Sequence, residues 1–131
     1  MKLTAKNLMP HVVDALLAAL SLLFVSFHWN SPSLLTLALL AIAATMILSG
    51  TRRAHDALFF LIAGIWGALS EAVAVNFGGA WYYPSPFQFG IPLWLPILWG
   101  IAGIFLVRLS DTVAEVIPGQ KKGRKAAKRS R

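Results

Sequence analysis

Four long apolar segments restrict what this chain can fold into more than any other feature. They cover residues 12–29, 33–49, 57–76 and 91–107. The only charged residues inside them are Asp14 and Glu71. A helix needs roughly 20 apolar residues, with a range of about 17–25, to cross the hydrocarbon core of a bilayer. The segments are rich in Leu and Ala and lack period-two alternation, which favours helices over strands. The sequence therefore predicts an all-α, polytopic membrane protein with four transmembrane helices in a bundle.

The composition argues against a soluble domain. Apolar residues make up 57% of the 131 positions, and charged residues make up only 13%, whereas soluble domains carry about 25% charged residues. Cysteine is absent, which excludes a disulfide framework and a thiol nucleophile. The first segment could be a signal peptide, but the triplet after it contains Pro32 and follows bulky residues, so we expect a retained helix.

The positive charges predict an orientation. Lys2 and Lys6 precede the first segment, Arg52 and Arg53 lie in the second connection, and Arg108 follows the fourth segment. The first and third connections contain no Lys or Arg. With four crossings, every basic residue falls on one side, as the positive-inside rule requires for cytoplasmic termini. We expect a multi-pass protein of the cell (inner or cytoplasmic) membrane.

The net charge of +7 belongs to the C-terminal tail. Residues 1–120 hold five basic and five acidic groups, and the remaining residues hold seven basic groups and no acid. We therefore divide the chain into a transmembrane domain, 1–118, and a disordered basic cytoplasmic tail, 119–131. Near a membrane such a tail binds anionic lipid headgroups. Nucleic acid is disfavoured as a partner because no aromatic residues alternate with the basic ones. The expected lipid contacts are Lys121, Lys122, Arg124, Lys125, Lys128, Arg129 and Arg131.

Small residues form a stripe on the third segment. Steps of three and four residues place them, together with Glu71, on one helical face. Because lipid tails compete for apolar side chains, helices in membranes associate through such small residues. The stripe predicts a packing surface for a neighbouring helix of this chain or of a partner. Its members are Gly64, Gly67, Ala74 and Gly78.

Glu71 is the strongest candidate for a functional group. It lies 14 residues after the start of the 57–76 segment, roughly 21 Å along the helix and in the outer half of the bilayer. Ionisable groups inside a membrane are costly and generally functional, although a carboxyl can also join helices by a hydrogen bond. Candidate partners on the same side are His28, Asn76, Tyr82, Tyr83, Gln88 and Trp99.

The third connection, 77–90, is long, aromatic and uncharged. It contains 14 residues and six aromatic side chains, whereas helix–helix connections usually need about 2–8 residues. Trp81, Tyr82 and Tyr83 fit an aromatic belt at the headgroup level. They equally fit a lid over a pocket that includes Glu71, which would suit an apolar ligand with one polar end, such as a quinone, an isoprenoid or a sterol-like lipid.

The remaining polar residues give weaker predictions. His28 lies near the outer end of the first segment and could pair with Glu71. The three His residues share no ligand spacing, so we predict no metal site, and we predict no cofactor. Asp14 lies near the cytoplasmic boundary, where Arg52, Arg53 or Arg108 could neutralise it. No nucleotide-binding loop or nucleophile elbow occurs, so the sequence favours a protein without catalytic activity.

Residues 71–99 also resemble a known group of proteins. A helix-borne Glu, a Gly- and Tyr-rich connection and a Pro-Leu-Trp helix start are similar to membrane proteins of the carotenoid-biosynthesis hydratase type and to several small uncharacterised prokaryotic membrane families. The resemblance covers under a third of the chain, and the hydratases have more spans. It implies a pocket for an apolar ligand. The matching positions are Glu71, Gly79, Tyr82, Tyr83, Gly90, Pro92, Leu93, Trp94 and Trp99.

Three functions remain compatible with the sequence. The first is binding of a lipid-like or isoprenoid molecule near the outer leaflet, with Glu71 as the polar contact. The second is a non-catalytic subunit or assembly factor, in which the glycine stripe binds a partner helix. The third is a small proton-coupled transporter that works as an oligomer.

Overall fold

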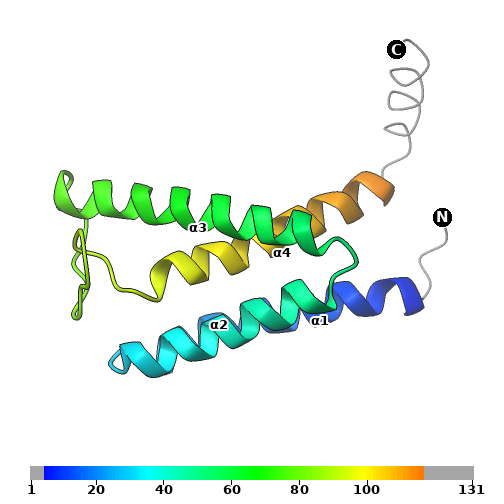
Figure 1. Ribbon diagram of the computed structural model, residues 1–131, viewed down its shortest axis with the longest axis horizontal. Helices are drawn as coiled ribbons and strands as arrows, with labels where there is room; N and C mark the ends of the chain where they lie inside the picture. The colour runs from blue at the N-terminus through cyan, green and yellow to red at the C-terminus, as the bar shows by residue number, and fades with distance from the viewer. Residues whose placement is uncertain (1–4, 117–131) are drawn as a thin grey trace, which may run out of the picture.

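The computed structural model describes residues 5–116 and contains, within that range, four α-helices joined by connections (Figure 1). Each helix is long and apolar enough to cross a membrane. The prediction of an all-helical chain with four such helices is confirmed. The helices are α1 (Ala5–His28), α2 (Pro32–Ser49), α3 (Arg53–Asn76) and α4 (Leu95–Val116).

The helices form two antiparallel hairpins, α1–α2 and α3–α4 (Figure 1). Helix α4 contacts all three others, most extensively α3, whereas α1 and α3 do not touch. One end of the molecule carries the α2–α3 connection, the start of α1 and the end of α4; we call it the terminal end. The other carries the α1–α2 turn and the long α3–α4 connection, residues 77–94; we call it the connection end.

The core lies between α2 and α4. Leu35, Leu39 and Met46 of α2 and Ile101 and Ile104 of α4 are almost completely buried. All four helices also expose large apolar side chains on their outer faces. An exposed apolar surface of this extent is abnormal for a soluble protein and is what a helix in lipid requires.

Glycines bring α3 and α4 into close contact. A Cβ atom at Gly64 would lie 2.8 Å from the carbonyl oxygen of Pro96, and one at Gly103 would lie 2.9 Å from that of Phe59. A Cβ at Gly67 would collide with the Trp99 ring. The absence of side chains at these positions lets the two backbones approach, which explains why this pair of helices has the largest interface.

The helix bounds differ from the predicted spans mainly at α4. The predicted fourth span, 91–107, begins before the helix does, because Ile91 belongs to a turn and its amide bonds to the carbonyl of Gln88. Helix α4 instead begins at Leu95 and continues past Arg108 to Val116. Hydropathy predicts where a segment is apolar, whereas backbone hydrogen bonding decides where a helix begins and ends. For the same reason α1 and α3 begin before the predicted 12–29 and 57–76 spans.

Candidate functional site

The candidate site lies at the connection end, where α3 meets the connection to α4. Glu71 lies five residues before the end of α3, which is about 7.5 Å along the helix axis. The hydroxyl of Tyr83 donates a hydrogen bond to Glu71 Oε2 over 3.0 Å. The Tyr83 ring also packs edge-on against Trp94, with ring centroids 6.1 Å apart. The connection is therefore tied to Glu71 through a half-buried aromatic side chain.

A tight turn shapes the second half of the connection. Phe89 and Gly90 both have positive φ angles, 53° and 75°, and the amide of Phe87 bonds to the carbonyl of Ile91. Two consecutive residues with positive φ are typical of a type I′ turn, which Gly adopts readily and Phe does not. Phe89 adopts this unfavourable conformation because a side chain outside the turn hydrogen-bonds to its carbonyl group.

The Asn76 side chain makes this hydrogen bond to the turn. Its Nδ2 donates to the carbonyl oxygens of Phe89, at 2.5 Å, and Ala72, at 2.8 Å. A Cβ atom at Gly90 would lie 2.9 Å from Val75, so the turn fits closely against the last turn of α3. Asn76 therefore acts as a clamp between α3 and the connection.

A hollow opens between the end of α3 and the connection. Its volume is about 560 Å³, and it is open to the outside. Burial raises the pKa of the Tyr83 phenol at its edge; the neighbouring Trp81 lowers it somewhat and the Glu71 carboxylate raises it again. This phenol therefore keeps its proton and remains a donor to Glu71. The hollow is lined by Val75, Asn76, Phe77, Gly78, Gly79, Tyr82, Tyr83, Pro86 and Gly90.

The predicted site residues do not all come together. Asn76, Tyr82 and Tyr83 line the hollow. Trp81 is exposed on the same connection, at 44% of its full surface. Trp99 lies against Gly67, one helical turn before Glu71 on α3. The structure therefore brings Asn76, Tyr82 and Tyr83 together at the hollow and joins Tyr83 to Glu71, whereas Trp99 packs against α3 at Gly67.

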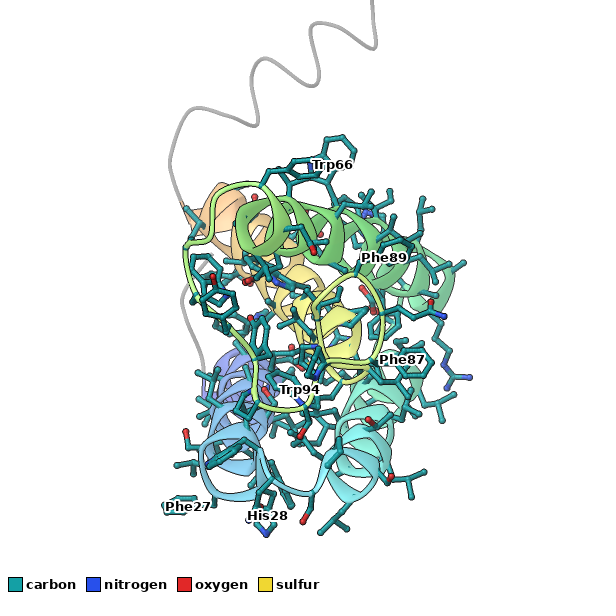
Figure 2. The ribbon with its side chains drawn as sticks, turned by 90° about the vertical axis from the view of Figure 1, so that its left-hand side faces the viewer. Phe27, His28, Trp66, Phe87, Phe89 and Trp94 are labelled. Carbon is teal, nitrogen blue, oxygen red and sulfur yellow. The ribbon has the colours of Figure 1, made fainter. Side chains whose placement is uncertain are left out.

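His28 lies apart from this region. It is the last residue of α1, which does not contact α3, and Figure 2 shows it at the opposite edge of this end from α3. Its ring packs against the tilted ring of Phe24, with ring centroids 5.4 Å apart. Its Nδ1 is buried and has no hydrogen-bond partner within the described part of the chain. The structure therefore does not bring His28 to Glu71.

The predicted small-residue stripe divides into two parts. Gly64 and Gly67 are buried against α4 of the same chain. Gly78 is exposed beyond the end of α3, and the atoms nearest to its missing side chain belong to Ala74. The stripe thus packs against α4 at Gly64 and Gly67, whereas Gly78 borders the hollow at the end of α3.

A buried ionic cluster lies at the terminal end, and the sequence predicted only part of it. Arg108 of α4 donates from Nη1 to Asp14 Oδ1 of α1, at 2.5 Å, and from Nη2 to Asp56 Oδ2 of α3, at 2.7 Å. Nη2 also donates to the carbonyl oxygen of Met46 on α2. Asp14 and Asp56 are only 6% and 3% exposed. One guanidinium group thereby joins all four helices.

Sequence reasoning named Arg108 among three candidates for Asp14 and missed Asp56. Arg52 instead forms an exposed ion pair with Asp111, at 2.9 Å. Asp56 lies four residues after Arg52 at the start of α3, and this spacing could have suggested a local pair rather than a contact with α4. Only the packing of α4 against α3 and against the α1–α2 hairpin selects Arg108.

No metal centre is apparent among residues 5–116, where no three His, Asp or Glu side chains are grouped as metal ligands. His55 Nδ1 lies 3.9 Å from Asp56, and His11 contacts the Thr112 hydroxyl at 3.1 Å. The expected anionic-lipid contacts of the tail all lie outside the described residues. They are Lys121, Lys122, Arg124, Lys125, Lys128, Arg129 and Arg131.

Comparison with protein-family models, with curated proteins and with solved structures finds no match for this chain. The resemblance of residues 71–99 to hydratase-type membrane proteins consequently stays an expectation from the sequence.

Proposed function

We propose that this chain is a multi-pass protein of the cell (inner or cytoplasmic) membrane that binds a lipid-like or isoprenoid molecule near the outer leaflet. The contact between Glu71 and Tyr83 carries the proposal. A carboxylate near the end of an apolar helix is bonded to an aromatic, uncharged connection that also borders a hollow. Such a site pairs one polar anchor with apolar walls, as amphiphilic ligands require.

The distribution of basic residues supports the orientation. Arg52, Arg53 and Arg108 all lie at the terminal end, and no Lys or Arg occurs between residues 53 and 108. By the positive-inside rule this distribution favours a terminal end in the cytoplasm, with Glu71 near the opposite surface.

The orientation predicts the location of the C-terminus. A reporter enzyme that is active only in the cytoplasm, fused after Arg131, is expected to be active. The same reporter inserted between Pro84 and Ser85, in the connection, is expected to be silent. Activity in the reverse pattern would overturn the four-span arrangement with cytoplasmic termini.

The ligand proposal predicts an effect of Glu71→Gln. This variant keeps the size of the side chain and can still accept the Tyr83 hydrogen bond, but it removes the charge. We expect bound lipid, counted by native mass spectrometry of protein released from bilayer nanodiscs, to fall about five- to tenfold, since a hydrogen bond to a charged group contributes about 1.5–3 kcal/mol to stability and we expect only part of that to be lost from binding.

Asp111→Asn is the matched control, because it neutralises an exposed carboxylate on α4 far from the connection end. It should leave the bound lipid unchanged. Equal lipid counts for wild type and Glu71→Gln would contradict the proposed function.

The subunit hypothesis has less structural support. Its partner helix was expected on the glycine stripe, but Gly64 and Gly67 already pack against α4. A partner would have to use another face, and the described residues give no reason to choose one. We therefore place lipid binding first.

A further inference from the structure

The hollow at the end of α3 is rich in hydrogen-bond acceptors. Both amide hydrogens of Asn76 are used, one on Ala72 and one on Phe89, which leaves the side-chain oxygen free to accept. The hydroxyl hydrogen of Tyr83 is used on Glu71. Among the side chains that line the hollow, only Tyr82 retains a hydrogen to donate.

The end of α3 adds further acceptors. The amides of Phe77 and Gly78 bond to the carbonyls of Val73 and Ala74, and the amide of Ala80 returns to Ala74 as well. This return is possible because Gly79 has a positive φ of 57°. The carbonyls of Val75 and Asn76, which line the hollow, receive no amide from the connection. A helix C-terminus with free carbonyls carries partial negative charge.

The segment that forms the hollow has no Lys or Arg side chain to balance this charge. Residues 54–107 contain no Lys or Arg. The walls of the hollow include the rings of Phe77 and Tyr82, which are 87% and 82% exposed and can present their faces to a ligand. Aromatic faces attract cations, and the attraction increases when water is excluded. The hollow thus combines free acceptors, a helix C-terminus, a carboxylate hydrogen-bonded to its edge, and aromatic rings. All of these favour a positively charged ligand group.

We propose that the hollow binds the ammonium group of a lipid headgroup. This inference rests on the proposed lipid binding and adds the chemistry of the polar end. An anionic headgroup would find no Lys or Arg within residues 54–107 to balance its charge, whereas an ammonium group supplies donors or a diffuse positive charge. The acyl chains would lie along the exposed apolar side chains of α3.

The test is a competition between two lipids in one bilayer. The full chain is placed in nanodiscs with equal amounts of phosphatidylethanolamine and phosphatidylglycerol, and the lipids that remain bound after release are identified by native mass spectrometry. For wild type we expect ethanolamine lipid to be enriched about threefold over glycerol lipid at the Glu71-dependent site. The basic tail is expected to bind the same amount of anionic lipid in every variant. Its contribution therefore drops out when each variant is compared with wild type.

Two variants separate the headgroup contact from a loss of structure. Glu71→Gln is expected to remove the enrichment by removing the linked charge. Tyr82→Leu is expected to reduce it about twofold while leaving the Glu71–Tyr83 bond in place, because the exposed Tyr82 ring supports no other element. Trp66→Leu, on an exposed face of α3 away from the hollow, should change nothing.

The outcomes are distinguishable. A ratio of bound ethanolamine lipid to glycerol lipid that is the same in wild type, Glu71→Gln and Tyr82→Leu would overturn the ammonium site. If the total bound lipid still falls in Glu71→Gln, the proposed function stands without it. Loss of enrichment in the presence of excess free ethanolamine would support the ammonium contact, because free ethanolamine offers the same cationic group without acyl chains.

Discussion

Replacing Arg108 with Met is expected to lower the free energy of unfolding by about 3–5 kcal/mol, because it leaves two buried carboxylates without their partner. Asp14 and Asp56 are almost fully buried, and Arg108 is the cation that bonds to both. The loss should also loosen the packing of the hairpins at the terminal end, since this one side chain bonds to α1, α2 and α3 there. Reversible unfolding in mixed detergent micelles, followed by circular dichroism, measures the change.

Arg52→Met is the control for this result. It breaks an ion pair with Asp111 in which both side chains are more than half exposed, and exposed pairs contribute about 0–1 kcal/mol. Restoring charge balance should restore stability: Arg108→Met combined with Asp14→Asn and Asp56→Asn is expected to recover most of the loss. Equal destabilisation by Arg52→Met and Arg108→Met would show that burial of the cluster does not matter.

Replacing Gly100 with Leu is expected to separate α3 from α4 and to cost about 1–3 kcal/mol or more, because overpacked interfaces force backbones to move. A Cβ at this position would collide with the Phe60 ring and would lie 2.9 Å from the Phe60 carbonyl oxygen. The backbone atom cannot turn away as a flexible side chain can. Unfolding in micelles measures the cost.

A matched control adds the same side chain where no helix packs. Ala44 lies on an exposed face of α2, so Ala44→Leu is expected to change the free energy of unfolding by less than about 0.5 kcal/mol. If Gly100→Leu behaved like Ala44→Leu, the close approach of α3 and α4 would not depend on glycine. Gly103→Leu offers an independent repeat on the same face, against Phe59.

The helices were predictable because their cause is local. A run of apolar residues without turn signals has to satisfy its own backbone hydrogen bonds, and a helix does so within the segment. The start of α4 was not predictable in the same way. Residues 91–94 are as apolar as the helix that follows, but the turn before them is held by Asn76 from α3. The helix therefore begins four residues after the start of the apolar segment, beyond a turn that hydropathy does not reveal.

The candidate site was likewise predictable only in part. Glu71 stood out as the only charge in its segment, and Tyr83 was one of several aromatic candidates beside it. Which aromatic residue bonds to Glu71 depends on how the connection folds back over α3, through Gly79 and the turn at Gly90. His28 was a weaker candidate partner for Glu71, and the structure separates the two because α1 makes no contact with α3.

The sequence by itself determined the class of structure: four apolar helices, their order, and a charge distribution with one exceptional carboxylate. Composition and spacing suffice for this because each helix satisfies its hydrogen bonds internally. Only the tertiary structure decided which partners the charges take. Arg108 bonds to Asp14 and Asp56 rather than to its sequence neighbours, and Glu71 bonds to Tyr83 rather than meeting His28. The physical reason is that a buried charge or carboxyl needs a partner within hydrogen-bond distance, and that distance is set by how helices remote in sequence pack together.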